Sequence, residues 1–123
     1  MSTFKYDLED RLVGFAVMIL TLSESLPKRF GIKSLANQLV RSGTSPALNY
    51  GEAQSAESPK DFLHKLRLCL KELRETQICL QIVKRKPYLE IDLVNPVLNE
   101  CGELVAIFTA SIETKKRNMQ RED

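Results

Sequence analysis

The sequence has no tryptophan, a single histidine, and no nucleotide-binding signature of the P-loop or GxGxxG type. The histidine, His64, stands among Lys60, Lys65 and Arg67 in a segment with helical periodicity. A lone histidine on a charged helix surface is far more often solvent-facing than catalytic, because a general base needs an orienting partner. We therefore expect no enzymatic activity, no cofactor and no small-molecule substrate.

Cysteine is scarce, and its three copies lie far apart. Cys69, Cys79 and Cys101 form no CxxC pair, and they lack the short spacing of a zinc knuckle. The paired Glu-x-x-His motifs of di-iron helical bundles are absent as well. We expect no metal site, and we expect reduced, mostly buried thiols in a cytoplasmic protein.

Long hydrophobic runs are also missing. The most apolar window, LVGFAVMILTL, is too short for a membrane span, which needs roughly 20 residues. The segment MSTFKYDLED has mixed charge before any apolar run, so we expect neither a secretory signal nor a membrane partner. The net charge of +2 at pH 7 is too small to indicate a nucleic-acid partner by itself.

What the sequence does contain is four segments in which apolar residues recur at steps of three and four, the spacing of an amphipathic helix. In the first segment Asp7 is the expected N-cap, and Pro27 marks the end. The second segment runs from about Lys33. The expected core positions of these two segments are Leu8, Leu12, Phe15, Ile19, Leu22, Leu26, Leu35, Leu39 and Ser42 or Gly43.

The third segment begins at Ser58, where SPKD has the pattern of a capped helix start, and it stops at Pro87. The fourth starts near Asp92. Their expected core positions are Phe62, Leu66, Cys69, Leu73, Thr76, Leu80, Val83, Val97, Cys101, Leu104, Phe108 and Ser111 or Ile112. Short connections favour antiparallel neighbours, so the prediction is an all-α, up-down-up-down four-helix bundle in one domain, residues 1–123, with a frayed tail after about residue 117.

The stretch RSGTSPALNYGEA, residues 41–53, places turn-forming residues inside a helical pattern. A loop of this length would be uncommon in a compact bundle. As a helix, the stretch carries four polar residues on one face, at steps of four, four and three: Arg41, Ser45, Asn49 and Glu52. The favoured prediction is a helix kinked at Pro46, with Asn49 and Glu52 pointing toward protein. A specific ligand or RNA contact and a break into two helices are the alternatives.

The pattern Arg41-x-x-x-Ser45-x-x-x-Asn49-x-x-Glu52 resembles the signature of the 23S ribosomal RNA intervening-sequence protein family, often called simply "four helix bundle protein". YDLEDRL is similar to that family's opening segment, SPKDFLHKLRLCLKELRET to its third helix, and PYLEID to the turn before its last helix. The resemblance covers about residues 6–115. The aromatic residue usual in the family's opening segment is absent here.

The resemblance implies a helical bundle that assembles into a homopentamer and has no enzymatic activity. It also implies an association with ribosomal RNA genes in some bacteria. The family is distantly similar to the accessory variability protein of diversity-generating retroelements, which partners a reverse transcriptase and nucleic acid. RNA or DNA is therefore the second partner to consider, after further copies of the chain itself.

The first segment carries a second apolar strip in addition to its core stripe. From Leu12 to Leu22 it has no charged residue, and Val13, Val17 and Leu20 lie away from the core positions. A helix that is apolar on two sides is usually buried on two sides. The strip therefore predicts a subunit interface, and a broad core stripe in a tight monomer is the alternative.

Basic residues gather at two places. The first group lies on one narrow stripe of the third segment and consists of Lys60, Arg67, Lys71 and Arg74. Antiparallel packing would bring a second group to one end of the bundle, namely Lys28, Arg29, Lys33, Lys84, Arg85 and Lys86. Either group could contact RNA or DNA phosphates with little sequence preference, and the alternative is a solvated charged surface.

Overall fold

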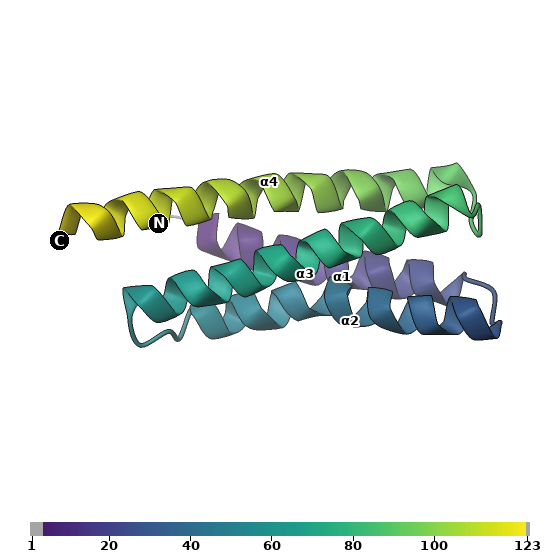
Figure 1. Cartoon of the computed structure of the whole chain (residues 1–123), viewed down its shortest axis with the longest axis horizontal. Helices are drawn as coiled ribbons and strands as arrows, with labels where there is room; N and C mark the ends of the chain where they lie inside the picture. The colour runs from purple at the N-terminus through teal and green to yellow at the C-terminus, as the bar shows by residue number, and fades with distance from the viewer. Residues whose placement is uncertain (1–3, 123) are drawn as a thin grey trace.

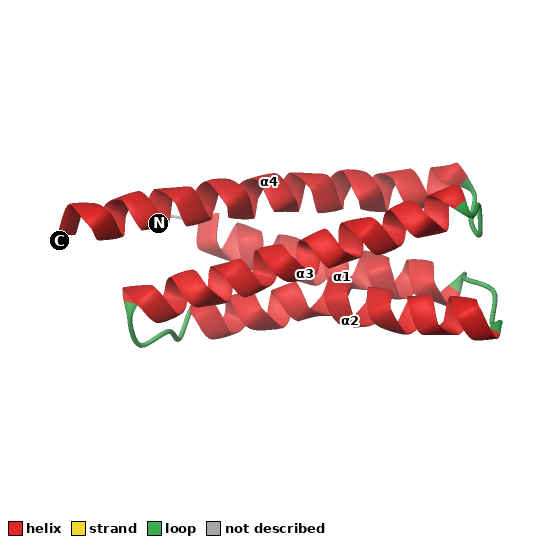
Figure 2. Ribbon diagram, in the orientation of Figure 1, coloured by secondary structure: helices red, strands yellow, loops and turns green. Residues whose placement is uncertain are grey.

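The computed structural model describes residues 4–122, which form four α-helices and no strand. The helices are α1 (Phe4–Glu24), α2 (Phe30–Ala53), α3 (Pro59–Arg85) and α4 (Ile91–Glu122). They lie lengthwise beside one another, with the α1–α2 and α3–α4 loops at one end and the α2–α3 loop at the other (Figures 1 and 2). The predicted all-α class is confirmed.

The four helices occupy the corners of a bundle. α2 packs against α3, α3 against α4, and α1 against both α2 and α4. Within the described residues α1 and α3 make no close backbone contact, so they stand at opposite corners. The outward faces of α1 and α3 therefore point away from the bundle in opposite directions.

The core follows the predicted periodicity closely. Phe15 and Ile19 of α1, Leu73 of α3 and Phe108 of α4 are fully buried. Phe62 departs from the prediction because it is only half-buried, and Leu63 takes its place in the core. The repeat of three and four residues thus identifies the inward face of each helix.

The helix boundaries confirm one predicted cap and correct another. The Ser58 side chain accepts a hydrogen bond of 3.0 Å from the Asp61 backbone N–H, as the SPKD pattern predicts. Asp7 is not the N-cap of α1, because the helix begins at Phe4 and no proline or glycine in residues 4–7 interrupts it. α2 also begins earlier than predicted, since the Lys33 N–H already donates to the Arg29 carbonyl at 2.8 Å.

The last helix extends past residue 117, where the sequence predicts a frayed tail. α4 continues to Glu122, and Met119 packs against the core of the bundle. No proline or glycine stands between Lys115 and Glu122 to stop the helix. No helix within residues 4–122 combines the length and the apolar character needed to cross a membrane.

Residues 41–53 belong to one uninterrupted helix, α2, so the alternatives of a loop or of a break into two helices are wrong. Two hydroxyl groups in the stretch bond to the helix itself: Thr44 donates to the Val40 carbonyl and Ser45 to the Arg41 carbonyl, each at 2.8 Å. Pro46 is fully buried inside the helix. Residues that favour turns elsewhere are accommodated here by packing and by local hydrogen bonds.

Small residues in α2 allow its neighbours to approach closely. A Cβ atom added to Gly43 would lie 2.7 Å from Cγ1 of Ile19, so only glycine fits against α1 at this point. One position earlier, the buried Ser42 hydroxyl lies 2.9 Å from the Thr76 hydroxyl of α3. Positions 42 and 43 therefore join α2 to both of its neighbours.

Candidate functional site

The polar signature on α2 lies along its contact with α3. The Arg41 guanidinium bridges two carboxylates of α3, with Nη1 at 3.0 Å from Glu72 and Nη2 at 2.7 Å from Glu75. The hydrogen bond to Glu75 and then the charge of Glu72 raise the pKa of Arg41 above its ordinary value. Lys65 of α3 reaches back to Glu52 at 2.7 Å. These ion pairs fix the two helices to each other.

The prediction for Asn49 and Glu52 holds only in part. Asn49 is half-buried, and its side chain makes no hydrogen bond within the described residues. The Glu52 side chain is 59% exposed, so it points to solvent more than predicted, although it pairs with Lys65. The signature residues Arg41, Ser45 and Glu52 interact with their own chain.

The second apolar strip of α1 is on the molecular surface. Val13, Val17 and Leu20 are 50%, 56% and 43% exposed. The strip has an exposed acidic residue at each end, Asp10 and Glu24, and neither makes an ion pair within the described residues. A broad core stripe is excluded as the explanation, because these side chains do not enter the core of this subunit.

The basic stripe of α3 is exposed along its whole length. Lys60, Arg67, Lys71 and Arg74 all face solvent, and no acid among the described residues pairs with them. The stripe does not end at Arg74, however. Ile78 and Ile82 are 63% and 45% exposed on the same face. Ile78 and Ile82 are not among the residues predicted from the sequence, although their helical angles place them on the face of the basic stripe.

The second basic group lies at one end of the bundle. Lys28, Arg29 and Lys33 flank the α1–α2 loop, and Lys84, Arg85 and Lys86 flank the α3–α4 loop. Both loops lie at the same end of the bundle in Figure 1. Three acidic residues share this end, Glu24, Glu90 and Asp92, and all three are exposed.

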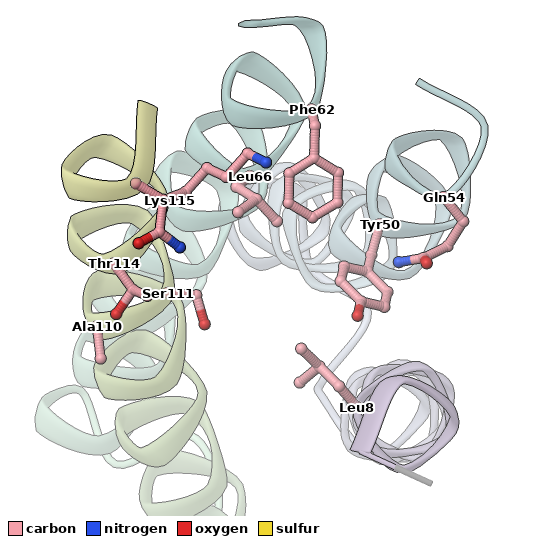
Figure 3. Close-up of a pocket in the computed structure, with 10 residues that line it drawn as sticks. Leu8, Tyr50, Gln54, Phe62, Leu66, Ala110, Ser111, Thr114 and Lys115 are labelled. Carbon is pink, nitrogen blue, oxygen red and sulfur yellow. The ribbon is translucent and has the colours of Figure 1, made fainter. Parts of the chain in front are cut away.

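A cleft of about 440 Å³ opens at the other end of the bundle, where all four helices contribute side chains (Figure 3). Its apolar residues include Leu8, Tyr50, Phe62 and Leu66. The Lys115 ammonium lies 5.4 Å from the centre of the Phe62 ring, in a cation–π arrangement. The remaining lining residues are Gln54, Ala110, Ser111, Thr114 and Asn118.

The side chains that line the cleft are mostly apolar or neutral. Tyr50 packs edge-to-face on Phe108 with ring centres 5.9 Å apart, and burial raises its pKa above the ordinary value of a tyrosine. Histidine and carboxylate side chains are absent from the described residues that line it. His64 lies on the exposed surface of α3, as predicted.

The three cysteines are buried thiols. Burial raises the pKa of Cys69 and of Cys101 to about 12, and it raises the pKa of Cys79 as well. The Cys69 thiol points at the Pro46 carbonyl, 3.5 Å away, and the Cys101 thiol at the Leu73 carbonyl, 3.3 Å away. No cluster of three metal-ligating side chains occurs within the part of the chain that the structure describes.

Comparisons with known proteins agree on one family. The sequence model of the 23S rRNA-intervening sequence protein matches residues 6–110. A crystal structure of a protein of unknown function from the S23 ribosomal protein family of Bacteroides thetaiotaomicron is similar to this chain, with 32% identity and a TM-score of 0.79. That match covers 85% of this chain and 97% of the other. No curated protein matches the chain.

Proposed function

The chain belongs to the 23S rRNA-intervening sequence protein family, and we propose that it is a non-enzymatic bundle that associates with copies of itself into a ring and acts as a cytoplasmic interaction module. The observation that carries this proposal is the exposed apolar strip of Val13, Val17 and Leu20 on α1. An apolar strip with no charge in its centre favours contact with another protein surface. A homopentamer is the ring size that the family resemblance implies.

The finer features of the bundle are part of the proposal. The loop positions in Figure 1 support an up-down-up-down order of helix directions. A bend of α2 at Pro46 is expected because proline has no N–H to donate to the Ser42 carbonyl.

The proposal is tested by the mass of the protein in solution. Light scattering behind a sizing column should give a multiple of the 14.0 kDa subunit mass for the natural chain at micromolar concentration. Val17→Glu would place an unpaired charge in the interface and should yield the subunit mass. Ala106→Glu, at an exposed position of α4, is the matched control and should leave the assembly intact. A natural chain that is monomeric under these conditions would overturn the proposal.

Nucleic acid is the second candidate partner. The observation that favours it is a group of six basic residues at the end of the bundle that carries the α1–α2 and α3–α4 loops, called here the loop end. A ring would repeat this modest patch in every subunit, and multivalency would strengthen its hold on a polyanion. Anisotropy of a labelled single-stranded RNA should rise on binding at low salt and lose affinity steeply as salt increases.

Two double variants locate the nucleic-acid surface. Lys28→Glu with Arg29→Glu removes part of the loop-end group, whereas Arg67→Glu with Lys71→Glu removes the centre of the α3 stripe. Loss of RNA binding in the first pair alone would assign the contact to the loop end. Absence of binding by the natural chain at about 50 mM salt, where phosphate contacts are strong, would refute this candidate.

A further inference from the structure

The outward face of α3 changes character along its length. Lys71 and Arg74 are followed on the same face by the exposed isoleucines Ile78 and Ile82, and then by Arg85. The two isoleucines line shallow grooves together with arginine side chains. An apolar centre with a charged rim is the composition of a protein-binding surface. Exposed isoleucines contribute nothing to binding phosphates.

The outward face of α1 also has exposed apolar residues between charged ends, but its charged residues are acidic. Asp10, the three apolar residues of the strip and Glu24 follow one another at steps of three and four, so they share one face. Arg11, the neighbouring cation, turns away from this face and pairs with Glu100 of α4 at 2.6 Å. The α1 face is therefore apolar in the centre and acidic at both ends.

The two faces also agree in length. Asp10 and Glu24 are 14 positions apart, and so are Lys71 and Arg85. In an α-helix this separation corresponds to about 21 Å. An acid at each end of the α1 face can therefore meet a base at each end of the α3 face while the apolar residues meet between them.

Contacts inside the bundle show that the two faces lie at the same height along its axis. Arg11 of α1 and Leu73 of α3 both reach the turn of α4 at Glu100 and Cys101. A second pair of contacts agrees to within about one helical turn: Ile19 packs on Gly43 of α2, and the next residue, Ser42, meets Thr76 of α3. A second copy displaced sideways, without sliding along the axis, would bring one face against the other.

We propose that the α1 face (Asp10, Val13, Val17, Leu20 and Glu24) of one subunit docks on the α3 face (Lys71, Arg74, Ile78, Ile82 and Arg85) of the next. The inference rests on the proposed self-association and specifies its partner surface. In this contact Val17 lies against Ile78, and the acidic ends of α1 meet the basic ends of α3. α1 against α1 would bring acids together, and α3 against α3 would bring bases together, so charge selects the mixed contact.

The mixed contact has a geometric consequence. It joins two different surfaces, so each subunit in a chain of copies keeps one free face of each kind. Because α1 and α3 stand at opposite corners at the same height, successive copies add without a rise along the axis. A heterologous contact without such a rise closes into a ring when each copy is also turned about the bundle axis by a constant angle, whereas translation alone would give an open row of copies.

The test is to mix two variants that each lack one face. Val17→Glu disables the α1 face, and Ile78→Glu disables the α3 face, so each variant alone should run as a monomer with the helical circular-dichroism signal of the natural chain. Mixed in equal amounts, they should form a heterodimer of two subunits, because the intact α3 face of one fits the intact α1 face of the other. The Ala106→Glu control should not form such a pair with either variant, because it remains in its own ring.

A charge exchange provides a second measurement that does not place charge in the apolar centre. Glu24→Arg should weaken the assembly about tenfold, and adding Arg85→Glu should restore it. If Ile78→Glu leaves the assembly intact, or the mixed variants remain monomers while the natural chain is oligomeric, the docking of α1 on α3 is wrong although self-association stands. A monomeric natural chain would instead refute the self-association itself.

Discussion

Residues 41–53 of α2 and the outward face of α1 differ in where their side chains find partners. In the α2 stretch, Arg41 pairs with Glu72 and Glu75, and the Ser42 hydroxyl meets that of Thr76. On α1, the side chains of the apolar strip lie about half exposed. The comparison teaches that polar residues of the α2 stretch find partners within their own chain, whereas the apolar strip of α1 lies open on the surface.

The largest loss of stability should come from adding a side chain at Gly43, where α2 lies closest to α1. Gly43→Ala would place a methyl group 2.7 Å from the stiff, fully buried Ile19 side chain, and it should lower the free energy of unfolding by about 1–3 kcal/mol. Urea denaturation at matched protein concentration measures the change.

The same helix offers a matched control for Gly43. Gly51 has nothing within 4 Å of an added Cβ, so Gly51→Ala should raise the free energy of unfolding by about 0.5–1 kcal/mol through helix propensity. Equal effects of the two substitutions would show that residues 41–53 are not tightly packed against α1.

A smaller effect is expected from the hydroxyl pair in the core. Thr76→Val keeps the shape of the side chain but leaves the buried Ser42 hydroxyl with only its longer bond of 3.4 Å to the Leu39 carbonyl, and it should cost about 1 kcal/mol of unfolding free energy. Thr109→Val removes an exposed hydroxyl bonded only to its own helix, and it should change stability by less than about 0.5 kcal/mol. Indistinguishable denaturation curves for the two variants would contradict a structural role for the pair.

The ion pairs at the edge of the stretch should matter less still. Arg41→Gln removes both contacts to α3, but the guanidinium is half exposed and water screens its charge. We expect a lower melting temperature than that of the natural chain, with a smaller change than Thr76→Val causes. The difference should shrink in 1 M salt. A loss that is independent of salt would mean that Arg41 acts through packing.

Ionisation of the buried cysteines should leave stability unchanged at neutral pH and should lower it only in alkali. Burial raises the folded-state pKa of Cys69 and Cys101 to about 12, whereas unfolded thiols titrate near 8.5. Their contribution is therefore complete below about pH 8.5 and is lost as pH rises toward 12, because unfolding releases their protons. Denaturation midpoints of the natural chain and of Cys69→Ala with Cys101→Ala should fall differently above pH 9, and parallel curves would contradict this account.

Features that depend on the residues of a single helix could be predicted from the sequence. The spacing from Val97 to Phe108 identifies the inward face of α4, and the Ser58 cap follows from local chemistry alone. The continuity of α2 through Pro46 could also be predicted from helical spacing.

Features that depend on the register between helices could not be predicted. The partners of Arg41 are set by how α2 and α3 slide along each other, which helical periodicity does not determine. The cleft at the end of the bundle combines side chains from four helices, so no pattern within a single helix predicts it. Ile78 is a different case, because its helical angle alone places it on the exposed face of α3.

Because Gly43 and Ile19 are in close contact, the substitutions that evolution can accept at one position depend on the residue at the other. An alanine at position 43 becomes acceptable only after residue 19 has lost part of its branched side chain, because the two groups compete for the same space. Ile19→Ala alone leaves a cavity, and Gly43→Ala alone creates a clash, so the two changes together should cost less stability than the sum of the single changes. Descendants of this sequence should therefore change the two positions together, or keep both.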